Sequence, residues 1–365
     1  LGISIMGRVE RFPEIFEYLM KLSIERPITL FIDEFQEFFK VNKSVYSDMQ
    51  RIWDMYHTKA HINLIVCGSI FSMMTKIFKD KKEPLYNRQT RFMSIKPFTP
   101  AVLKEIMAEY NPNYTSEDLL ALYSFTGGVA KYVQLLVDAG ATTKTKMLNH
   151  IIKADSVFLG EGKAILIEEF GKDYGVYFSI LSAIARGKTL RSEIEQIVGR
   201  EIGGYLTKLE KEYEVITKNQ PIFEKSSTKN VRYTIEDNFF TFWFRFIYKY
   251  NYMLEIENYD AVKTIINRDY ETFSGKMLER YFKRVLMESK AYTRIGSWWD
   301  RKGENEIDIV AENELNDEAV FIEVKRKEEN FDADALNEKV DVFTRATGKF
   351  KDYDVSQKGL SMTDM

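Results

Sequence analysis

The sequence has almost no cysteine and no long apolar run. Cys67 is the single cysteine among 365 residues, so no disulfide can form within the chain, which suits a reducing, cytoplasmic setting. No stretch reaches the roughly 18 apolar residues that a transmembrane helix needs, and we expect no membrane partner. Residues 1–8 lack the layout of a signal peptide and no initiator Met is present, so we expect a chain whose start is missing.

Positive charge is not in excess either. The net charge is −3, with 45% hydrophobic and 29% charged residues, which is typical of a soluble globular protein and excludes nucleic-acid binding over the whole surface. A local basic patch lies between Thr217 and Tyr233, where four cations accompany one acid, Glu224. The four cations are Lys218, Lys225, Lys229 and Arg232. The patch is a candidate nucleic-acid contact, although the charge count by itself favours an ordinary solvated hairpin.

The first ~150 residues alternate between helical and strand patterns. Phe12–Ser23 and Ser47–Lys59 have apolar residues at helical spacing, whereas Ile28–Ile32 and Ile62–Cys67 are short apolar runs. Buried strands joined by helices predict a doubly wound α/β fold with a parallel sheet.

Two further helical patterns follow this region. Ser116–Phe125 begins with Ser116 as an expected N-cap, and Lys131–Asp138 comes after a pair of glycines. They predict a small helical subdomain, which we place at residues 111–168, after an α/β core at residues 1–110.

Residues 169–255 have the order of a winged helix. Tyr174–Arg186, Leu190–Val198 and Glu201–Tyr213 read as three short helices, and a turn region then leads to a strand at Val231–Ile235. Eight aromatic residues follow between positions 239 and 250. Core packing between domains is the favoured interpretation of these aromatics, and stacking on bases is the alternative.

The last segment, residues 265–365, predicts a compact α/β module. A long amphipathic helix at Asp269–Ser289 leads to strands at Glu306–Ala311 and Val320–Lys325, and then to a helix at Ala333–Arg345.

Two acids end the first apolar strand. Asp33 and Glu34 follow Ile28–Ile32, at the edge of an α/β sheet where ligands bind. Hydrolysis of a nucleoside triphosphate needs one acid to hold Mg²⁺ and another to polarise the attacking water, so the pattern predicts a Walker B site. A pair of solvated acids is the alternative. Ser69 ends the second strand, where such a residue senses the γ-phosphate, and Arg88 offers a cation for the same phosphate or is a surface arginine.

The order of motifs resembles that of archaeal and bacterial AAA+-like ATPases whose C-terminal region has an uncharacterised function. The matching segments are Phe31–Gln36, Val66–Ser69, Pro84–Arg88, Pro97–Phe98, Thr126–Tyr132 and Phe242–Phe246. The resemblance covers nearly the whole chain. It implies a P-loop NTPase-like sheet, ATP and Mg²⁺ as cofactors, and Asp33, Glu34, Ser69 and Arg88 as site residues.

The sequence departs from this family in two places. The family carries a Gly-rich loop ending in Lys-Ser/Thr that cradles phosphates, and that pattern is absent from residues 1–365. Ala130 also stands where the family tends to have proline. Without the loop, this polypeptide should bind and hydrolyse ATP poorly, and a missing N-terminal segment explains the absence better than a degenerate site.

A second set of acids marks the C-terminal module. Asp308 lies on one strand, and Glu323 and Lys325 lie two residues apart on the next, so the latter two point the same way. Glu279 lies on the preceding helix. The set resembles the core of PD-(D/E)xK nucleases, a restriction-endonuclease-like fold, which implies Mg²⁺ on Asp308 and Glu323 with Glu279 as a third acid. A hairpin with solvated charges is the alternative.

These features predict an ATP-dependent protein that acts on, or is regulated by, nucleic acid. A nucleotide-switch scaffold whose winged helix and nuclease-like module contact only proteins is the rival, and an inactive fragment is a third reading. DNA or a protein partner on the winged helix, and a homo-oligomer, stay open.

Overall fold

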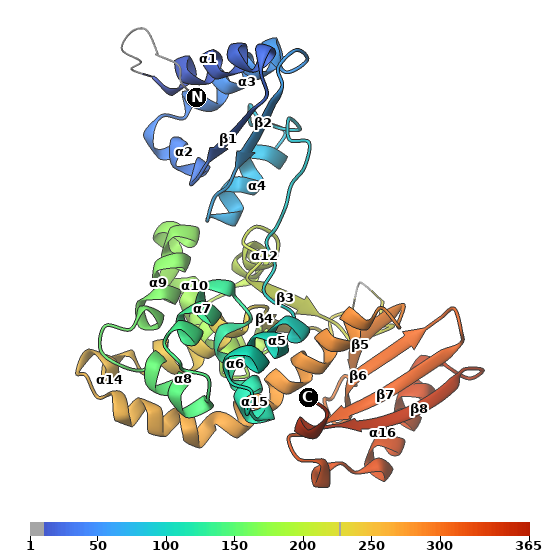
Figure 1. Cartoon of the computed structure of the whole chain (residues 1–365). Helices are drawn as coiled ribbons and strands as arrows, with labels where there is room; N and C mark the ends of the chain where they lie inside the picture. Colours follow the sequence, from blue (N-terminus) through green and yellow to red (C-terminus); the bar gives the residue numbers. More distant parts are fainter. Residues whose placement is uncertain (1–10, 226–227) are drawn as a thin grey trace. The chain divides into compact units, whose positions relative to one another are not determined.

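The computed structural model describes residues 11–225 and 228–365 and has a mixed α/β fold (Figure 1). The chain divides into two compact units, with the boundary between Ile95 and Lys96. The finer division at residues 110, 168 and 255 stays a prediction. Within the described ranges no helix is both long and apolar enough to cross a membrane.

The first unit is built on two parallel strands, β1 (Ile28–Ile32) and β2 (Ile62–Val66). Its helices are α1 (Phe12–Glu25), α2 (Phe38–Val41), α3 (Ser44–Tyr56) and α4 (Phe71–Lys79), with the 3₁₀ turn η1 (Phe35–Glu37). The strands pair in register from Ile28↔Ile62 to Ile32↔Val66, so both carboxyl ends lie at the same edge. The predicted parallel arrangement is therefore observed for these two strands.

One face of this sheet is covered. Phe16 and Met20 of α1 and Met49 and Ile52 of α3 are buried in one apolar cluster with the inward side chains of the strands. On the opposite face Phe31 and Ile65 keep 59% and 42% of their surface exposed. Strands of parallel sheets usually carry apolar residues on both faces, because helices cover both faces of the sheet. β1 and β2 also carry apolar residues on their exposed face.

The second unit begins with five helices: α5 (Pro100–Tyr110), α6 (Ser116–Thr126), α7 (Ala130–Asp138), α8 (Lys144–Ile151) and α9 (Val157–Phe170). The expectation that Ser116 caps α6 is wrong by one residue. Thr115 is extended, and its hydroxyl accepts the Asp118 backbone N–H while the Asp118 carboxylate accepts the Thr115 N–H. This reciprocal pair satisfies donors that a helix start leaves unpaired.

Three helices and a hairpin follow in the predicted order. The helices are α10 (Tyr174–Ala185), α11 (Arg191–Val198) and α12 (Gly203–Lys211), and the 3₁₀ turn η2 (Gly171–Asp173) precedes them. The hairpin pairs β3 (Ile216–Asn219) with β4 (Arg232–Ile235) antiparallel, from Ile216↔Ile235 to Asn219↔Arg232.

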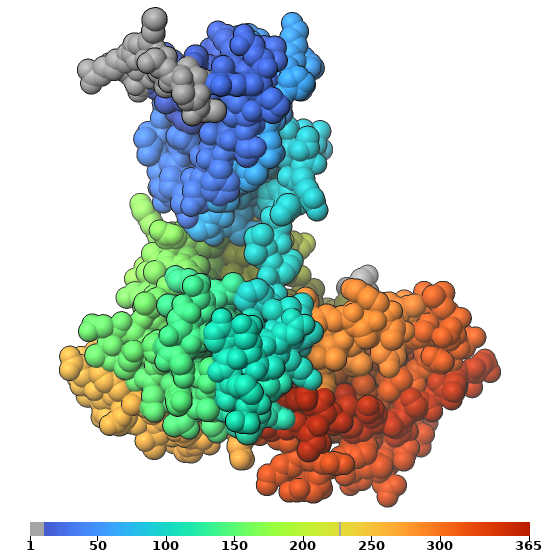
Figure 2. Space-filling model, viewed as in Figure 1, coloured from blue at the N-terminus to red at the C-terminus, as the bar shows by residue number. Residues whose placement is uncertain are grey.

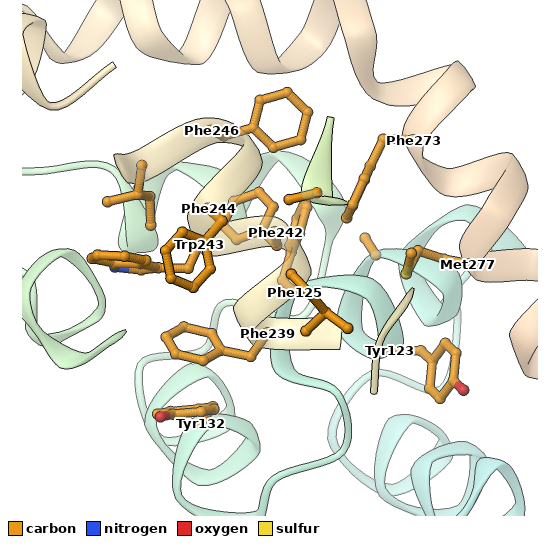
Figure 3. Close-up of a cluster of buried hydrophobic side chains, with 14 of the residues drawn as sticks. Tyr123, Phe125, Tyr132, Phe239, Phe242, Trp243, Phe244, Phe246, Phe273 and Met277 are labelled. Atoms are coloured by element: carbon orange, nitrogen blue, oxygen red, sulfur yellow. The ribbon is translucent and has the colours of Figure 1, made fainter. Parts of the chain in front are cut away.

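An aromatic core joins these helices to the long helix α15 (Tyr259–Ser289) (Figure 3). It is built from α13 (Asn238–Phe242) and the π-helix η3 (Trp243–Tyr248), with α14 (Asn251–Glu255) next along the chain. Phe239, Phe242 and Phe244 are completely buried, and the Phe125 ring of α6 lies 4.7 Å from that of Phe242. Core packing, the favoured interpretation of the aromatic run, is confirmed for these residues.

The C-terminal part is a four-stranded sheet in the order β5-β6-β7-β8. The strands are β5 (Arg294–Trp299), β6 (Glu306–Asn313), β7 (Glu318–Val324) and β8 (Asp354–Leu360), with α16 (Ala333–Thr347) and the 3₁₀ turns η4 (Glu328–Asn330) and η5 (Met362–Asp364). β5, β6 and β7 are antiparallel neighbours, and β8 runs parallel to β7. Sequence periodicity did not predict β5 or β8.

The two faces of this sheet pack against different helices. Ile309 and Ile322 join the core that contains α15, whereas Val310 and Phe321 join the core that contains α16. The turn η5 packs against α6, where the red end of the chain meets green in Figure 2. The helices and the C-terminal sheet therefore share one hydrophobic core that runs from Leu103 to Leu360.

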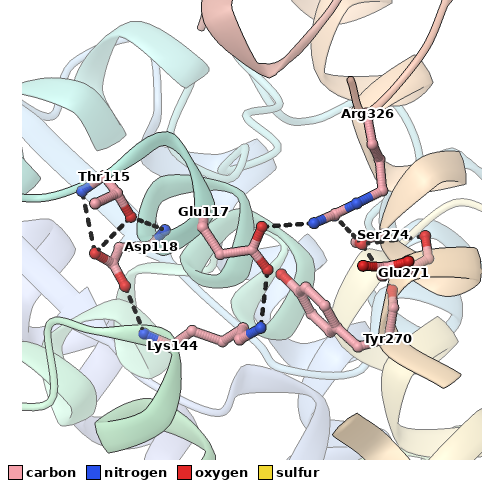
Figure 4. Close-up of polar contacts among 8 residues, drawn as sticks. All are labelled: Thr115, Glu117, Asp118, Lys144, Tyr270, Glu271, Ser274 and Arg326. Carbon is pink, nitrogen blue, oxygen red and sulfur yellow. Dashed lines mark hydrogen bonds and ion pairs between the residues drawn. The ribbon is translucent and has the colours of Figure 1, made fainter. Parts of the chain in front are cut away.

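Arg326, directly after β7, ties this sheet to the helices (Figure 4). Its guanidinium donates to the Glu117 carboxylate on α6 and to the Ser274 hydroxyl on α15. Lys144 donates to the other Glu117 oxygen at 3.0 Å, and both cations lie over the Tyr270 ring. Two cations thus share one carboxylate, which holds α6, α8 and α15 against the end of β7.

Two glycines of α9 provide a matched test of this core. A Cβ on Gly162 would lie 2.5 Å from the buried Trp243 ring, whereas a Cβ on Gly160 would meet nothing within 4 Å. We expect Gly162→Ala to lower the free energy of unfolding by about 1–3 kcal/mol through overpacking. Gly160→Ala should raise it by about 0.5–1 kcal/mol through helix propensity. Urea unfolding measures both, and equal effects of the two substitutions would contradict the described packing.

Candidate functional site

The acids after β1 are held by residues at the end of β2. Cys67 N–H donates to the Ile32 carbonyl at 3.0 Å, and Phe35 N–H donates to the Cys67 carbonyl at 2.8 Å. Between these two bonds the chain turns through Glu34, whose φ of 47° is left-handed. The turn leaves Asp33 and Glu34 at the carboxyl edge of the sheet, which is where ligands bind in α/β folds.

Asp33 is exposed and ionised. The Cys67 thiol donates to its Oδ1 atom at 2.7 Å, and the Glu34 backbone N–H donates to the same atom at 2.8 Å. Because both bonds favour the carboxylate, with the thiol contributing most, they lower the pKa of Asp33. The free Oδ2 side of an ionised, exposed carboxylate is an oxygen ligand of the kind that Mg²⁺ prefers.

Glu34 is oriented by two side chains. The Gln36 amide donates to its Oε2 atom, and the Ser69 hydroxyl donates to the same atom at 2.8 Å. These bonds lower the pKa of Glu34, with Gln36 the larger contributor. The structure therefore brings together Asp33, Glu34 and Ser69, which the sequence predicted from two strands more than 30 residues apart.

Gln36 and Cys67 are site residues that the sequence reasoning missed. Gln36 is 1% exposed, and a Cβ on Gly68 would lie 2.1 Å from its Oε1 atom, so a larger residue at position 68 would force the Gln36 side chain to shift. That Oε1 atom is buried and accepts no hydrogen bond from any residue that the structure describes. The only signal in the sequence was that Gln36 follows Asp33 and Glu34 closely, and this does not indicate that the Gln36 amide donates to the Glu34 carboxylate.

Arg88 does not join this group. Its guanidinium makes two bonds to the Asp54 carboxylate of α3, at 2.9 and 2.7 Å, and donates to the carbonyls of Pro84 and Tyr86. These contacts use its donors within the first unit, so the γ-phosphate role of Arg88 stays a prediction that the described contacts do not support.

The second candidate site lies where β6 and β7 meet. Pairing between these strands ends at Ile309↔Ile322, and the register of β6 against β5 shifts between Gly296 and Trp298. At this irregularity the Asp308 carboxylate accepts the Val324 backbone N–H at 2.8 Å. Burial, and then the charge of Glu279, raise the pKa of Asp308 to about 7.

Glu323 is buried between two lysines. Its Oε1 atom accepts from Lys325 at 2.8 Å, and both its oxygens accept from Lys339 of α16, at 2.9 and 3.0 Å. Lys339 was not predicted, because nothing in the sequence shows that α16 returns to the end of β7. The hydrogen bond between Glu323 and Lys325 agrees with the expectation that the two side chains point the same way.

The expected convergence of Glu279, Asp308 and Glu323 on one metal ion is not observed. In residues 11–225 and 228–365 no three His, Cys, Asp or Glu side chains are gathered so that they could hold a metal ion. The physical reason is local compensation. Lys276 pairs with Glu279 at 2.9 Å, and Lys325 and Lys339 pair with Glu323. The Asp308 carboxylate accepts the Val324 backbone N–H.

The basic patch of the hairpin divides into two parts. Lys218, Lys225 and Lys229 are exposed, in agreement with a surface role. Arg232 is not available for a phosphate, because it pairs with Glu306 of β6 at 2.9 Å and lies over the Trp299 ring at 4.5 Å. Its place in the predicted nucleic-acid contact stays a prediction that these contacts do not support.

The segment between β3 and β4 docks on β5. Ile222 N–H donates to the Ser297 carbonyl at 2.9 Å, and the Trp299 indole donates to Asn230 at 2.9 Å. Ile222 is buried in the same cluster as Trp298. The described part of this turn is therefore attached to the C-terminal sheet, unlike a hairpin tip that is free in solvent.

Comparison with known proteins assigns both ends of the chain. Residues 8–136 match a family described as an ATPase domain predominantly from Archaea. Residues 243–338 match a family described as archaeal and bacterial proteins of unknown function. An ATPase-like domain followed by this second domain defines the class of protein.

Relatives occur in Methanocaldococcus jannaschii. The uncharacterized protein MJECL04 is 33% identical over 314 residues, which cover 82% of this chain and 67% of that protein. The uncharacterized protein MJ0424 is 34% identical over 56 residues, which cover 15% of this chain and 54% of that protein. The chain belongs to the archaeal and bacterial family of ATPase-like proteins with this C-terminal domain, as its motif order predicted.

The raised pKa of Asp308 predicts a pH effect on stability. Folding raises this pKa from its ordinary value of 3.8 to about 7, so the folded protein holds a proton that the unfolded chain releases above pH 4. The free energy of unfolding should therefore fall as pH rises from about 4 to 7. We expect Asp308→Asn, which keeps an acceptor for Val324 N–H, to raise Tm at pH 8 by about 2–4 °C, with a smaller gain at pH 5.

Asp300→Asn is the control for this measurement. Hydrogen bonds from Asn305 and from backbone N–H groups outweigh partial burial and lower the pKa of Asp300, so its amide variant should gain no stability at pH 8. An Asp308→Asn gain that is the same at pH 5 and pH 8 would contradict the raised pKa.

Proposed function

We propose that this protein is a nucleotide-hydrolysing switch that acts on nucleic acid, with the Asp33–Glu34 site as its ATPase centre. The observation that carries the proposal is the arrangement of Glu34, which the Ser69 hydroxyl and the Gln36 amide fix at the edge of the parallel strands. A carboxylate fixed in this way can polarise a water molecule for attack on a phosphate.

The residues present fit Mg²⁺ and the attacking water. Asp33 would hold Mg²⁺, usually through water, since its carboxylate is ionised and exposed. Bound Mg²⁺ would offset the charge that develops on the transferred phosphoryl group. Ser69 links Glu34 to β2, so a ligand at Ser69 would alter the position of Glu34. The Gly-rich loop that would cradle the phosphates is absent from residues 1–365.

Two features of the second unit support action on nucleic acid. The order α10-α11-α12-β3-β4 is that of a winged helix, with α12 as the expected recognition helix and Lys218, Lys225 and Lys229 exposed nearby along the hairpin. The order α15-β5-β6-β7-α16-β8, with a helix on each face of the sheet, supports a nuclease-like fold.

In the C-terminal module we propose binding in preference to cutting. Glu279 and Glu323 already pair with lysines, and Asp308 accepts a backbone N–H, so Mg²⁺ would have to displace Lys276 or Lys339 before two carboxylates could share it. A signalling scaffold is the second candidate function. The contact of Ile222 with Ser297 and the pair of Arg232 with Glu306 favour it, because they engage the hairpin with protein.

Glu34→Gln tests the ATPase centre. In a form of the protein that includes the expected phosphate-binding loop, this variant should bind ATP like the parent and lose turnover by about 100-fold or more, since it lacks the carboxylate that polarises water. Glu37→Gln is a matched control three residues away, where Lys40 pairs with the carboxylate at 2.7 Å, and it should keep parental turnover. If Glu34→Gln hydrolysed ATP at the parental rate, Glu34 would not be the residue that polarises the attacking water.

Charge reversal tests the hairpin. Lys225→Glu/Lys229→Glu should weaken DNA binding by about tenfold at low salt and reduce its salt dependence, because two phosphate contacts would be lost. Arg232→Gln should instead lower stability, because it leaves Glu306 without its partner. Fluorescence anisotropy with a labelled duplex measures the binding. Absence of detectable DNA binding by the parent at low salt would favour the scaffold.

A further inference from the structure

A pocket on the second unit carries a strong positive charge that the proposed function does not use. It has a volume of about 110 Å³ and is lined by Arg186, Arg245, Phe246, Lys249 and Asp269. Pockets for drug-sized ligands measure about 300–1,000 Å³, so this one is suited to a single small group.

The three cations of the pocket come from different elements. Arg186 directly follows α10, Arg245 lies in the middle of the π-helix η3, and Lys249 directly follows that helix. A π-helical turn is rare and often marks a functional site, because it widens the helix and redirects its side chains. Here it presents Arg245 and Lys249 to the same pocket.

The one acid of the pocket, Asp269, is paired with a cation outside the pocket. Asp269 accepts two bonds from Arg268, at 2.7 and 2.9 Å, and these bonds make the largest contribution to lowering the pKa of Asp269. Arg268 itself does not line the pocket. Within the described part of the chain, no carboxylate lies within ion-pair distance of Arg186, Arg245 or Lys249. The pocket is therefore lined by three cations and one carboxylate, so positive charge is in excess even though Asp269 also acts on Arg245 and Lys249.

Arg245 is poorly satisfied for a half-buried cation. Its guanidinium makes one long bond, at 3.4 Å to the Ala185 carbonyl, and lies near the rings of Phe246 and Phe273. Five N–H donors in a planar fork are suited to an oxyanion, and Phe246, a buried ring labelled in Figure 3, is the apolar residue of the pocket lining. Burial also lowers the pKa of Arg245, a cost that a bound anion would offset.

We propose that Arg186, Arg245 and Lys249 form a binding site for one phosphate group. Arg245 would make the buried, directional contact, and the exposed Arg186 and Lys249 would close over the phosphate from the solvent side. The site connects to the hairpin, since Tyr233 N–H of β4 donates to the Thr189 carbonyl three residues after Arg186. A phosphate of a polynucleotide backbone and a free small phosphate share this chemistry.

The full chain is titrated with inorganic phosphate to test the pocket. Ionic strength is held constant, and chloride is the reference anion. Isothermal calorimetry gives the phosphate affinity. Lys249→Ala and Arg186→Ala should each weaken it by about tenfold, because each removes one charge-assisted contact. Asp269→Asn should tighten it, because it removes the negative charge from the wall and releases Arg268. Lys146→Ala, an exposed lysine of α8, is the matched control and should leave the affinity unchanged.

A labelled oligonucleotide then distinguishes the two sources. Loss of oligonucleotide affinity in Lys249→Ala assigns the pocket to a backbone phosphate. The oligonucleotide affinity of the hairpin variant Lys225→Glu/Lys229→Glu is measured separately. Phosphate binding that depends on the pocket, with oligonucleotide binding that does not, assigns it to a small phosphate. Phosphate binding that is equal in parent, Lys249→Ala and Lys146→Ala overturns the proposal, and so does the absence of binding of either ligand to the parent. These outcomes do not depend on ATP turnover, so the ATPase proposal stands or falls separately.

Discussion

The second unit depends on the packing of α6, α13 and α15 around Phe125. The Phe125 ring lies 4.7 Å from Phe242 and 5.8 Å from Tyr270, and all three side chains are buried. Aromatic side chains of this size contribute most of the apolar area that folding removes from water. Because α15 also covers one face of the C-terminal sheet, the same core fixes both the hairpin and the β6–β7 site. The Arg326–Glu117 ion pair further fixes the end of β7 against α6.

Charge compensation explains why the two candidate sites differ. At Asp33 and Glu34 the partners are neutral donors, namely a thiol, a hydroxyl, an amide and a backbone N–H, so the negative charge stays available for a cation. At Glu279 and Glu323 the partners are lysines, and the charge is already balanced. A carboxylate whose partners are neutral can still attract a metal ion and is suited to phosphate chemistry. A carboxylate that is paired with a lysine instead stabilises the contact between two structural elements.

The sequence predicted what local patterns control. Apolar runs located β1, β2 and the α6 and α15 helices, and the strand-end acids located Asp33 and Glu34 beside Ser69. It missed what depends on contacts between distant residues. β8 is mostly exposed and alternates poorly, so pairing with β7 defines it. Arg88 and Arg232 were predicted to contact phosphate, and Lys339 was not singled out, because only the fold supplies Asp54, Glu306 and Glu323 as their partners.

We propose that the Asp33–Glu34 site hydrolyses ATP in response to nucleic acid. The most direct test is the steady-state rate of Mg²⁺-dependent ATP hydrolysis by the full-length protein, measured with and without duplex DNA at low salt. The account predicts measurable turnover that rises when DNA is added and returns to the basal rate at high salt, where phosphate contacts weaken. Turnover that DNA leaves unchanged, or no turnover in either condition, would contradict it.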